Sequence, residues 1–268
     1  MNQLLFFTLV TVILVASFIV GHRTSAKIKN ETDYFLGGRK MGFFYIFMTL
    51  LATQLGGGAI VGTAEAAYLH GWKAISYSAG VALGMIFMAC GIGAKLRRMN
   101  VSTVPEIFKN IYGSENLQIF SSILYIISMF ILLIAIGVSA RKYALSLGYD
   151  NEIIFIIFWG TVIAYTTSGG LTAVTQTDIL QIIFVLLAFV ITFFVFKSSD
   201  FTLATQQSPK TLVDDIPWIN WLVIPCFSTM IGQDMAQRCF AAKSPKIVPY
   251  AMITAAIILV IATLLPTY

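Results

Sequence analysis

Long apolar segments alternate with short polar connections along the whole chain. A helix needs about 20 mostly apolar residues to cross the hydrocarbon of a bilayer, so this pattern predicts membrane-spanning helices. Residues 1–268 are therefore expected to form one transmembrane domain of an all-α integral membrane protein. The eight apolar segments are residues 3–21, 42–69, 73–95, 116–147, 151–168, 177–197, 217–240 and 247–266.

The second apolar segment is interrupted by three consecutive glycines, Gly56, Gly57 and Gly58. Glycine is unfavourable inside a helix, so the run predicts that helical hydrogen bonding lapses within residues 55–59. Unwound backbone at membrane depth is tolerated where it is buried in protein or lines a wet cavity, and many secondary transporters bind substrate and ion at such breaks. The alternative is that these glycines only let a neighbouring helix approach closely.

Composition and charge support the membrane assignment and give it an orientation. The chain is 58% hydrophobic and only 11% charged, whereas soluble domains carry about 25% charged residues. Its net charge of +5 does not point to nucleic-acid binding, because the basic residues are concentrated in particular loops between the apolar segments. The connections after the first, third and seventh segments are expected to be cytoplasmic, with the N-terminus outside an inner or plasma membrane, because they hold most Lys and Arg residues. These are Arg23, Lys27, Lys29, Arg39, Lys40, Lys95, Arg97, Arg98, Lys109, Arg238, Lys243 and Lys246.

The chain shows no pattern that would predict an enzyme. Its three cysteines have no metal-ligand spacing, and the sequence contains no recognisable nucleophile, metal cluster or phosphate-binding loop. No organic cofactor is therefore expected. The stretch after the third segment, residues 101–113, predicts a short amphipathic helix that begins near Thr103, with Pro105 in its first turn.

Several ionisable residues fall within the apolar segments or at their ends, where charge is costly and usually faces a cavity or a partner. Arg141 lies near the outer end of the fourth segment, and its partner is predicted to be either a substrate carboxylate or Glu65. Asp178 opens the sixth segment, where an acid can simply interact with a helix dipole. Asp234 and Arg238 are four residues apart, which predicts an internal ion pair.

The seventh segment contains a second expected helix break. Pro225 removes a backbone donor from the helix, and Gly232 follows it. Between them stand two hydroxyl side chains, Ser228 and Thr229, which we expect to face a substrate.

Five stretches resemble the sodium/solute symporter family, which includes sodium-coupled transporters of proline, pantothenate, sugars and sialic acid. The resemblance extends from the second apolar segment to the seventh, and its most specific part is the GGL-x-AV-x-x-TD-x-x-Q pattern. The matching stretches are DYFLGGRKMG (33–42), LATQLGGGAIVGTAEAAYLHG (51–71), TVPEIFKNIYG (103–113), SGGLTAVTQTDILQ (168–181) and QRCFAAKSPK (237–246).

The resemblance implies a leucine-transporter-type core of ten helices, arranged as two inverted repeats of five and preceded by one extra helix. Residues 3–21 would be the extra helix, residues 42–197 the first repeat and residues 217–268 the start of the second. Members of the family run longer, so the second repeat is expected to be incomplete here. The chain would then be a C-terminally truncated fragment, or a second chain would complete it.

The resemblance also implies the site residues. The backbone carbonyls of Ala52 and Leu55 would bind sodium, and Asp178 would lie on the ion's route or bind a second sodium. No metal other than sodium is expected. Further sodium ligands in this family come from a core helix that would follow residue 268. The substrate cavity would be lined by Gly56, Gly57, Ala59, Arg141, Ser228 and Thr229.

Together these features predict a sodium-coupled secondary symporter that works by alternating access. Its partners would be sodium as the coupling ion, the lipid bilayer and a small polar solute, most simply an amino acid or another carboxylate. Two alternatives stay open: a membrane sensor built on the same fold, and a non-functional fragment of a symporter. No oligomeric state is predicted.

Overall fold

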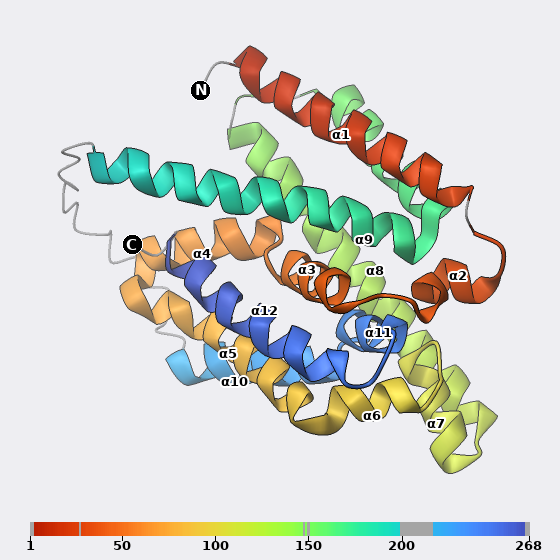
Figure 1. Ribbon diagram of the computed structural model, residues 1–268. Helices are drawn as coiled ribbons and strands as arrows, with labels where there is room; N and C mark the ends of the chain where they lie inside the picture. The colour runs from red at the N-terminus through yellow and green to blue at the C-terminus, as the bar shows by residue number, and fades with distance from the viewer. Residues whose placement is uncertain (1–2, 27, 147, 149–150, 199–216, 266–268) are drawn as a thin grey trace.

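The computed structural model describes residues 3–26, 28–146, 148, 151–198 and 217–265 (Figure 1). Helices account for nearly all of these ranges, and within them the only β interaction is an isolated bridge between Met41 and Ala242. The predicted all-α fold is therefore confirmed. The two-repeat inverted symmetry stays a prediction.

Each of the eight apolar segments is mainly helical in its described residues. Within the described residues, five helices are long and apolar enough to cross a membrane, and two shorter helices, α3 and α10, are also apolar. The principal elements are α1 (Gln3–Ser25), α3 (Phe43–Gln54), α4 (Gly57–His70), α5 (Ile75–Phe87), α6 (Gly93–Arg98), α8 (Glu115–Ser146), α9 (Glu152–Ser198), α10 (Trp218–Ile231), α11 (Gln233–Ala241) and α12 (Ile247–Leu264). The shorter elements are α2 (Glu31–Leu36), η1 (Gly37–Arg39), η2 (Gly71–Ala74), η3 (Met88–Ile92) and α7 (Val104–Tyr112).

The fifth and sixth apolar segments lie in α9 as two helices that meet at a kink, with no loop between them. The bend is at Gly170, whose backbone has φ 54° and ψ −157°. A side chain there would be strained by the positive φ and would also press against the carbonyl oxygen of Tyr34. The polar stretch before it, which resembled a connection in the sequence, is helical. Asp178 consequently lies within the helix that follows the kink and not at its start, which argues against the alternative that it only interacts with a helix dipole.

The core is built where α3, α5, α11 and α12 meet, with α9 against α3 (Figure 1). α12 packs against both α3 and α5, and α1 lies along α9. Apolar side chains from these helices are fully buried together, among them Leu50, Leu51, Met85, Met235 and Met252. This packing buries Leu55, at the end of α3, while the next residue, Gly56, is half-buried.

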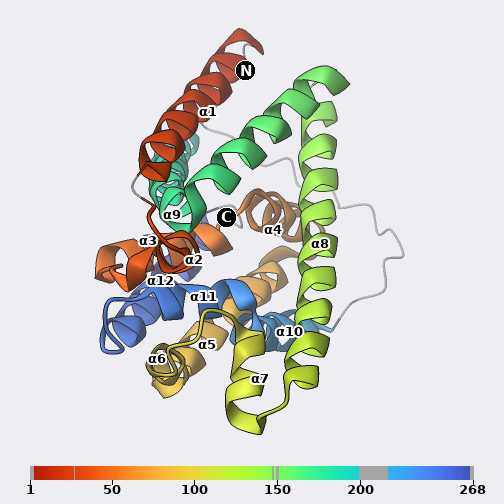
Figure 2. The same ribbon diagram turned by 90° about the vertical axis from the view of Figure 1, so that its right-hand side faces the viewer.

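Helix α8 runs along one side of the molecule, with α7 at one of its ends (Figure 2). Its one described buried residue is Ser121, while Ile126, Phe130 and Ile131 are each more than 60% exposed. A continuous apolar surface of this kind would be unfavourable in water but suits contact with hydrocarbon. The chain is therefore a multi-pass membrane protein.

The short helix predicted near Thr103 is α7, Val104–Tyr112, and it ends at Gly113 in the left-handed conformation. The Glu106 carboxylate accepts a hydrogen bond from the backbone N–H of Ser102 at 2.9 Å and another from the Thr103 hydroxyl at 3.2 Å. Its side chain thus holds the turn that leads into the helix, whereas Thr103, at the N-cap, makes no capping hydrogen bond to the backbone of the helix.

Candidate functional site

The helix of the second apolar segment breaks at Leu55 and Gly56. Leu55 still donates its N–H to the carbonyl of Leu51, at 2.9 Å, but its ψ of 43° leaves the helical region. Gly56 is extended, with φ −74° and ψ 166°, and the next helix starts with the bond from Ile60 N–H to the Gly56 carbonyl. The predicted lapse within residues 55–59 is confirmed.

The break exposes the last turn of α3, which contains Ala52 and ends beside Leu55. Carbonyls of a last helical turn lack the donors four residues on that they would have in a continuous helix. Leu55 is buried and Ala52 is half-buried, so these carbonyls lie inside the protein. They are the kind of oxygen donor that hard cations prefer.

The space around Gly56 distinguishes between the two interpretations of the glycine run, a helix break and close helix packing. A Cβ built on Gly56 would meet no heavy atom within 4 Å, so no helix approaches this residue closely. The backbone at Gly57 and Ala59 belongs to α4, and the surroundings of their side chains lie outside the described residues. At Gly56, therefore, the glycine permits a break beside open space and does not mediate helix packing.

Asp178 joins three helices close to this break. It projects from α9, and its Oδ2 accepts a hydrogen bond from the hydroxyl of Thr49, a fully buried residue of α3. The Nη2 of Arg238, on α11, lies 3.9 Å from the same carboxylate oxygen. A carboxylate placed between two helices that flank breaks can bind a cation or hold those helices together.

The structure corrects the predicted ion pair between Asp234 and Arg238. The Arg238 Nη1 donates to the backbone carbonyl of Asp234 at 3.0 Å, while the guanidinium is paired with Asp178. Helical spacing placed Asp234 and Arg238 on one face, but it could not reveal an acid 60 residues earlier in the chain. Arg238 is 8% exposed, so its charge is largely removed from solvent, and the Asp178 carboxylate is the described acid beside it.

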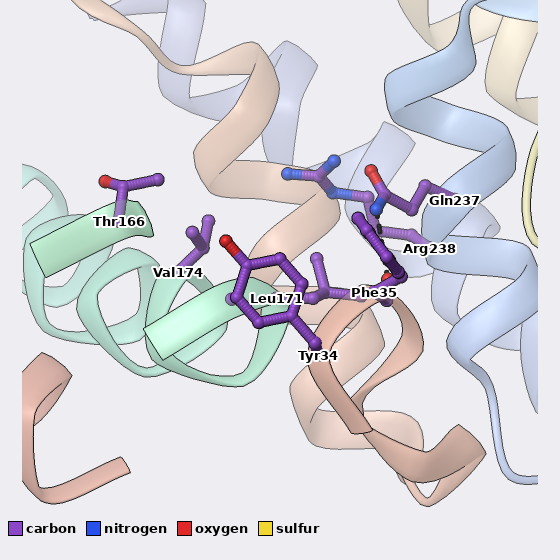
Figure 3. A pocket seen from close by; sticks show the side chains of 8 residues that line it. Tyr34, Phe35, Thr166, Leu171, Val174, Gln237 and Arg238 are labelled. Carbon is purple, nitrogen blue, oxygen red and sulfur yellow. Dashed lines mark hydrogen bonds between the residues drawn. The ribbon is translucent and has the colours of Figure 1, made fainter. Parts of the chain in front are cut away.

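A pocket of about 210 Å³ lies beside Arg238, between α2, the bend of α9 and α11 (Figure 3). Figure 3 shows Phe35 beside Gln237 and Arg238, and Tyr34, Leu171 and Val174 on the side away from them. The Tyr34 hydroxyl donates to the carbonyl of Thr167 at 2.7 Å and ties α2 to α9. The pocket is thus an open one, lined by the two short helices α2 and α11 and by α9.

The seventh apolar segment breaks at Gly232, the last residue of the stretch in which a break was expected. Gly232 has φ −62° and ψ 130°, and it separates α10 from α11. The helix continues through Pro225, so the proline does not itself cause the break. The Tyr125 hydroxyl, from α8, donates to the carbonyl of Ile231 at 2.7 Å and satisfies a group at the end of α10. The sequence offered no signal for this contact.

The two hydroxyl residues before this break differ in their surroundings. The hydroxyls of Ser228 and Thr229 both donate to the carbonyl of Pro225, at 3.0 and 2.8 Å. Ser228 is exposed, whereas Thr229 is buried where α10 packs against Gly84 of α5. Each hydroxyl donates locally and keeps its oxygen lone pairs, so it can accept from a substrate donor but must give up the local bond to donate to a substrate.

Arg141 is paired with Glu152, an acid that the sequence analysis did not consider. Its Nη2 lies 3.0 Å from the Glu152 Oε1, and its guanidinium lies 5.9 Å from the ring centroid of Phe155. Glu152 begins α9, so this contact joins the end of α8 to the start of the next helix. Arg141 is therefore already placed to bind a carboxylate. In this structure that carboxylate is the side chain of Glu152.

A family model described as the sodium:solute symporter family matches residues 34–266. The chain belongs to this family. Sodium/glucose cotransporter 4 of Danio rerio is 32% identical to it over 199 residues, which are 70% of this chain and 29% of that relative. The sodium/pantothenate symporter of Haemophilus influenzae is 26% identical over 280 residues, covering 94% of this chain and 57% of that protein.

A solved structure has the same fold. It is the substrate-bound outward-open state of a sodium-coupled sialic acid symporter, with a TM-score of 0.78 and 19% identity, and the match covers 97% of this chain and 58% of that one. The chain spans less than two thirds of the length of each of these three proteins. The family members it matches are transporters and not enzymes, as the sequence predicted.

Proposed function

We propose that the chain carries out its part of a sodium-coupled symport of a small polar solute, an amino acid or another carboxylate, by alternating access. The observation that carries this proposal is the break at Leu55 and Gly56, which leaves buried carbonyls and open space in the middle of an apolar helix. Membership of the sodium:solute symporter family supports sodium as the coupling ion.

In this proposal the carbonyls of Ala52 and Leu55 supply two of the sodium ligands. A hard cation takes oxygen ligands and must replace much of its hydration shell, so two carbonyls need further oxygens beside them. Asp178 is the ionisable oxygen donor on the ion's route, because it reaches α3 through Thr49. Sodium binding would then depend on the relative position of α3 and α9, because both helices would supply oxygen ligands.

The proposed substrate cavity begins at Gly56, Gly57 and Ala59 and extends toward the second break, where Ser228 and Thr229 stand. Gly56 has open space beside it, which supports this role. Arg141 is the proposed partner of a substrate carboxylate, in exchange for Glu152. We further propose that residues 42–197 form one repeat and that residues 217–268 begin its inverted counterpart.

We also propose that the N-terminus faces outward, with residues 22–41 and 96–115 in the cytoplasm. The excess of Lys and Arg in these connections supports this orientation. Cysteines introduced at Ile28 and at Gln207 test it, although position 207 lies outside the described residues. An impermeant reagent added to intact cells should label position 207 and leave position 28 unmodified. The opposite pattern would reverse the topology.

The functional test is solute uptake into proteoliposomes, with sodium exchanged for potassium. It uses the protein as its gene encodes it, and Asp178→Asn and Asp178→Ala as variants. Uptake should require sodium, and both variants should weaken that dependence, because neither keeps a charged oxygen ligand. Equal uptake in sodium and potassium by the unmodified protein would refute sodium coupling, and unaltered sodium dependence in the variants would remove Asp178 from the ion's route.

A further inference from the structure

Two arginines from different parts of the chain meet at one asparagine. Arg39 ends η1, Arg97 lies in α6, and Asn100 follows the end of α6. The Asn100 Oδ1 accepts a hydrogen bond from the Arg39 Nη1 and another, at 3.2 Å, from the Arg97 Nη1. A guanidinium only donates, so the amide oxygen and not the amide nitrogen lies between the two side chains. A single neutral residue therefore holds two positive charges next to each other.

The same two guanidiniums bind backbone carbonyls but keep unused donors. The Arg39 Nη2 donates to the carbonyls of Asn100 at 2.7 Å and Val101 at 3.3 Å, and the Arg97 Nε donates to the carbonyl of Ala242, just after α11. Each guanidinium carries five N–H donors, of which Arg39 has acceptors for three and Arg97 for two among the described residues. The protein alone thus does not satisfy either guanidinium.

No acid of the described chain balances these charges. Within the described residues, no carboxylate lies within 4.0 Å of either guanidinium. The acids in the two adjoining turns bind elsewhere, since Asp33 accepts from the backbone N–H of Lys29 and Glu106 from that of Ser102. The general excess of Lys and Arg in these connections explains why cations gather here, but not why two of them share one oxygen. An anion is the component that this arrangement lacks.

The two arginines lie where a membrane-spanning segment ends. Arg97 and Arg98 are the last basic residues of the candidate span Gly62–Arg98. The level of the lipid headgroups is therefore expected next to this site, and basic pockets at that level bind anionic headgroups. Three further cations adjoin the site in the chain and are exposed: Lys40, Arg98 and Lys243.

Exposed apolar side chains come directly after or before the basic residues. Phe43 and Phe44, at the start of α3, are 42% and 49% exposed, and Ile92, just before α6, is 42% exposed. A free phosphate ion would gain nothing from these apolar side chains. An anionic phospholipid matches both parts, because it carries a phosphate at one end and hydrocarbon at the other.

We propose that Arg39 and Arg97 bind the phosphate of an anionic phospholipid, in the leaflet beside the connections that are rich in Lys and Arg. The phosphate oxygens accept from the unused guanidinium N–H groups, and the phosphate charge balances the two arginines. Since η1, α6 and the end of α11 all take part, the bound lipid ties these three segments together. The site goes beyond the proposed transport and does not depend on sodium coupling.

Asn100→Asp tests the site by supplying the anion from the protein itself. Aspartate has almost the shape of asparagine, can accept from both guanidiniums, and tolerates the φ of 56° at this position. The matched control is Asn110→Asp, which adds the same charge at an exposed position of α7, at the same end of the molecule (Figures 1 and 2).

The readout is the melting temperature of the purified protein in detergent micelles, titrated with phosphatidylglycerol or with phosphatidylcholine of the same acyl chains. A ligand that binds only the folded state raises this temperature. The unmodified protein and Asn110→Asp should respond to phosphatidylglycerol at concentrations about tenfold lower than to phosphatidylcholine, a difference of 1.4 kcal/mol in binding. Asn100→Asp should lose this preference and should melt at a higher temperature than the unmodified protein when no lipid is added.

A second pair of variants keeps the net charge constant. Arg97→Lys removes the planar fork that suits a phosphate, whereas Arg98→Lys changes a neighbouring exposed cation in the same way. Arg97→Lys should raise the half-stabilising concentration of phosphatidylglycerol about tenfold, or 1.4 kcal/mol, and Arg98→Lys should leave it unchanged. This pair decides the question if Asn100→Asp does not fold.

Equal lipid responses of Asn100→Asp and Asn110→Asp, or of Arg97→Lys and Arg98→Lys, would overturn the site and leave both arginines as structural partners of backbone carbonyls. Equal stabilisation by phosphatidylcholine would overturn it too. Inorganic phosphate is the remaining arm: if it stabilises the protein as phosphatidylglycerol does and abolishes the effect of the lipid, the ligand is a free anion and the assignment to a lipid is wrong. Because no transport is measured, a failure of sodium-driven uptake leaves this result intact.

Discussion

Gly56 and Gly84 both lie in apolar segments, yet they differ in the space around them: one faces open space and the other faces a closely packed helix. A Cβ at Gly56 would meet no heavy atom within 4 Å, and the helix ends there. A Cβ at Gly84 would collide with the Cys226 carbonyl and with the side chain of Thr229, and the helix continues. Gly80, one turn earlier, faces the Leu222 carbonyl in the same way.

The difference shows that glycine serves two purposes in this chain. In α5 it lets α10 approach until backbone meets backbone, which is the usual way small residues stabilise helix pairs in membranes. Between α3 and α4 it allows the chain to leave the helix beside an unfilled space. The first purpose concerns stability, and the second concerns the proposed binding site. Substitutions at these positions should therefore separate stability from transport.

The largest loss of stability is expected for Gly80→Leu. Its side chain has to displace the backbone of α10 at Leu222, and overpacking of this kind costs about 3 kcal/mol or more. The apparent melting temperature in detergent should fall steeply, or folded protein should fail to accumulate. A melting curve like that of the unmodified protein would show that α5 and α10 do not pack as described.

A smaller loss is expected for Gly84→Ala, which adds one methyl group at the same interface. The Thr229 side chain can move, but the Cys226 carbonyl belongs to the backbone, so the cost should be about 1–2 kcal/mol. Combining Gly84→Ala with Thr229→Ser, which removes a methyl group from that side chain, should restore only part of this loss. Complete recovery would mean that the side chain alone limits the approach.

Thr49→Val tests the polar surroundings of the break with almost no change in volume. The variant removes the hydroxyl that donates to Asp178, and a hydrogen bond to a charged group is worth about 1.5–3 kcal/mol. The sodium concentration that gives half-maximal uptake should change several-fold, while uptake at saturating sodium persists. Thr53→Val is the matched control, because the Thr53 hydroxyl bonds only to the Thr49 carbonyl of its own helix. Equal shifts in both variants would argue against a role for Thr49.

The smallest effect on stability is expected for Gly56→Ala. The φ of −74° and ψ of 166° are accessible to alanine, and the added methyl group meets open space, so the free energy of unfolding should change by less than about 0.5 kcal/mol. The melting temperature of this variant, measured beside that of Gly84→Ala, is the most economical check of the contrast. A loss as large as that of Gly84→Ala would show that Gly56 is a packing residue.

Local signals in the sequence predicted much of the fold. Segment length and hydrophobicity indicated every apolar helix, and the glycine run indicated the break at Leu55 and Gly56. The sequence failed where tertiary contacts override local preference. The polar residues before Gly170 correctly indicated a boundary between two helices, but α1 and α2 pack against this part of α9, and the boundary is a kink without a loop.

Only those features of the site that lie within a single helix could be predicted from the sequence. Arg238 was matched to Asp234 by helical spacing, yet its partner Asp178 stands on another helix, as does Thr49. The contacts of Tyr125, Gln233 and Gln237 with backbone groups depend on how distant helices meet, which no periodicity indicates. These residues position the elements around the two breaks.

The most direct measurement for the central claim is sodium-driven uptake by Gly56→Leu, compared with the unmodified protein at equal amounts of folded transporter. The leucine side chain should enter the space beside the break without disturbing helix packing, so the melting temperature should stay close to that of the unmodified protein while uptake is lost. Unchanged sodium-driven uptake by a folded Gly56→Leu variant would contradict the claim that the break between α3 and α4 is the binding site.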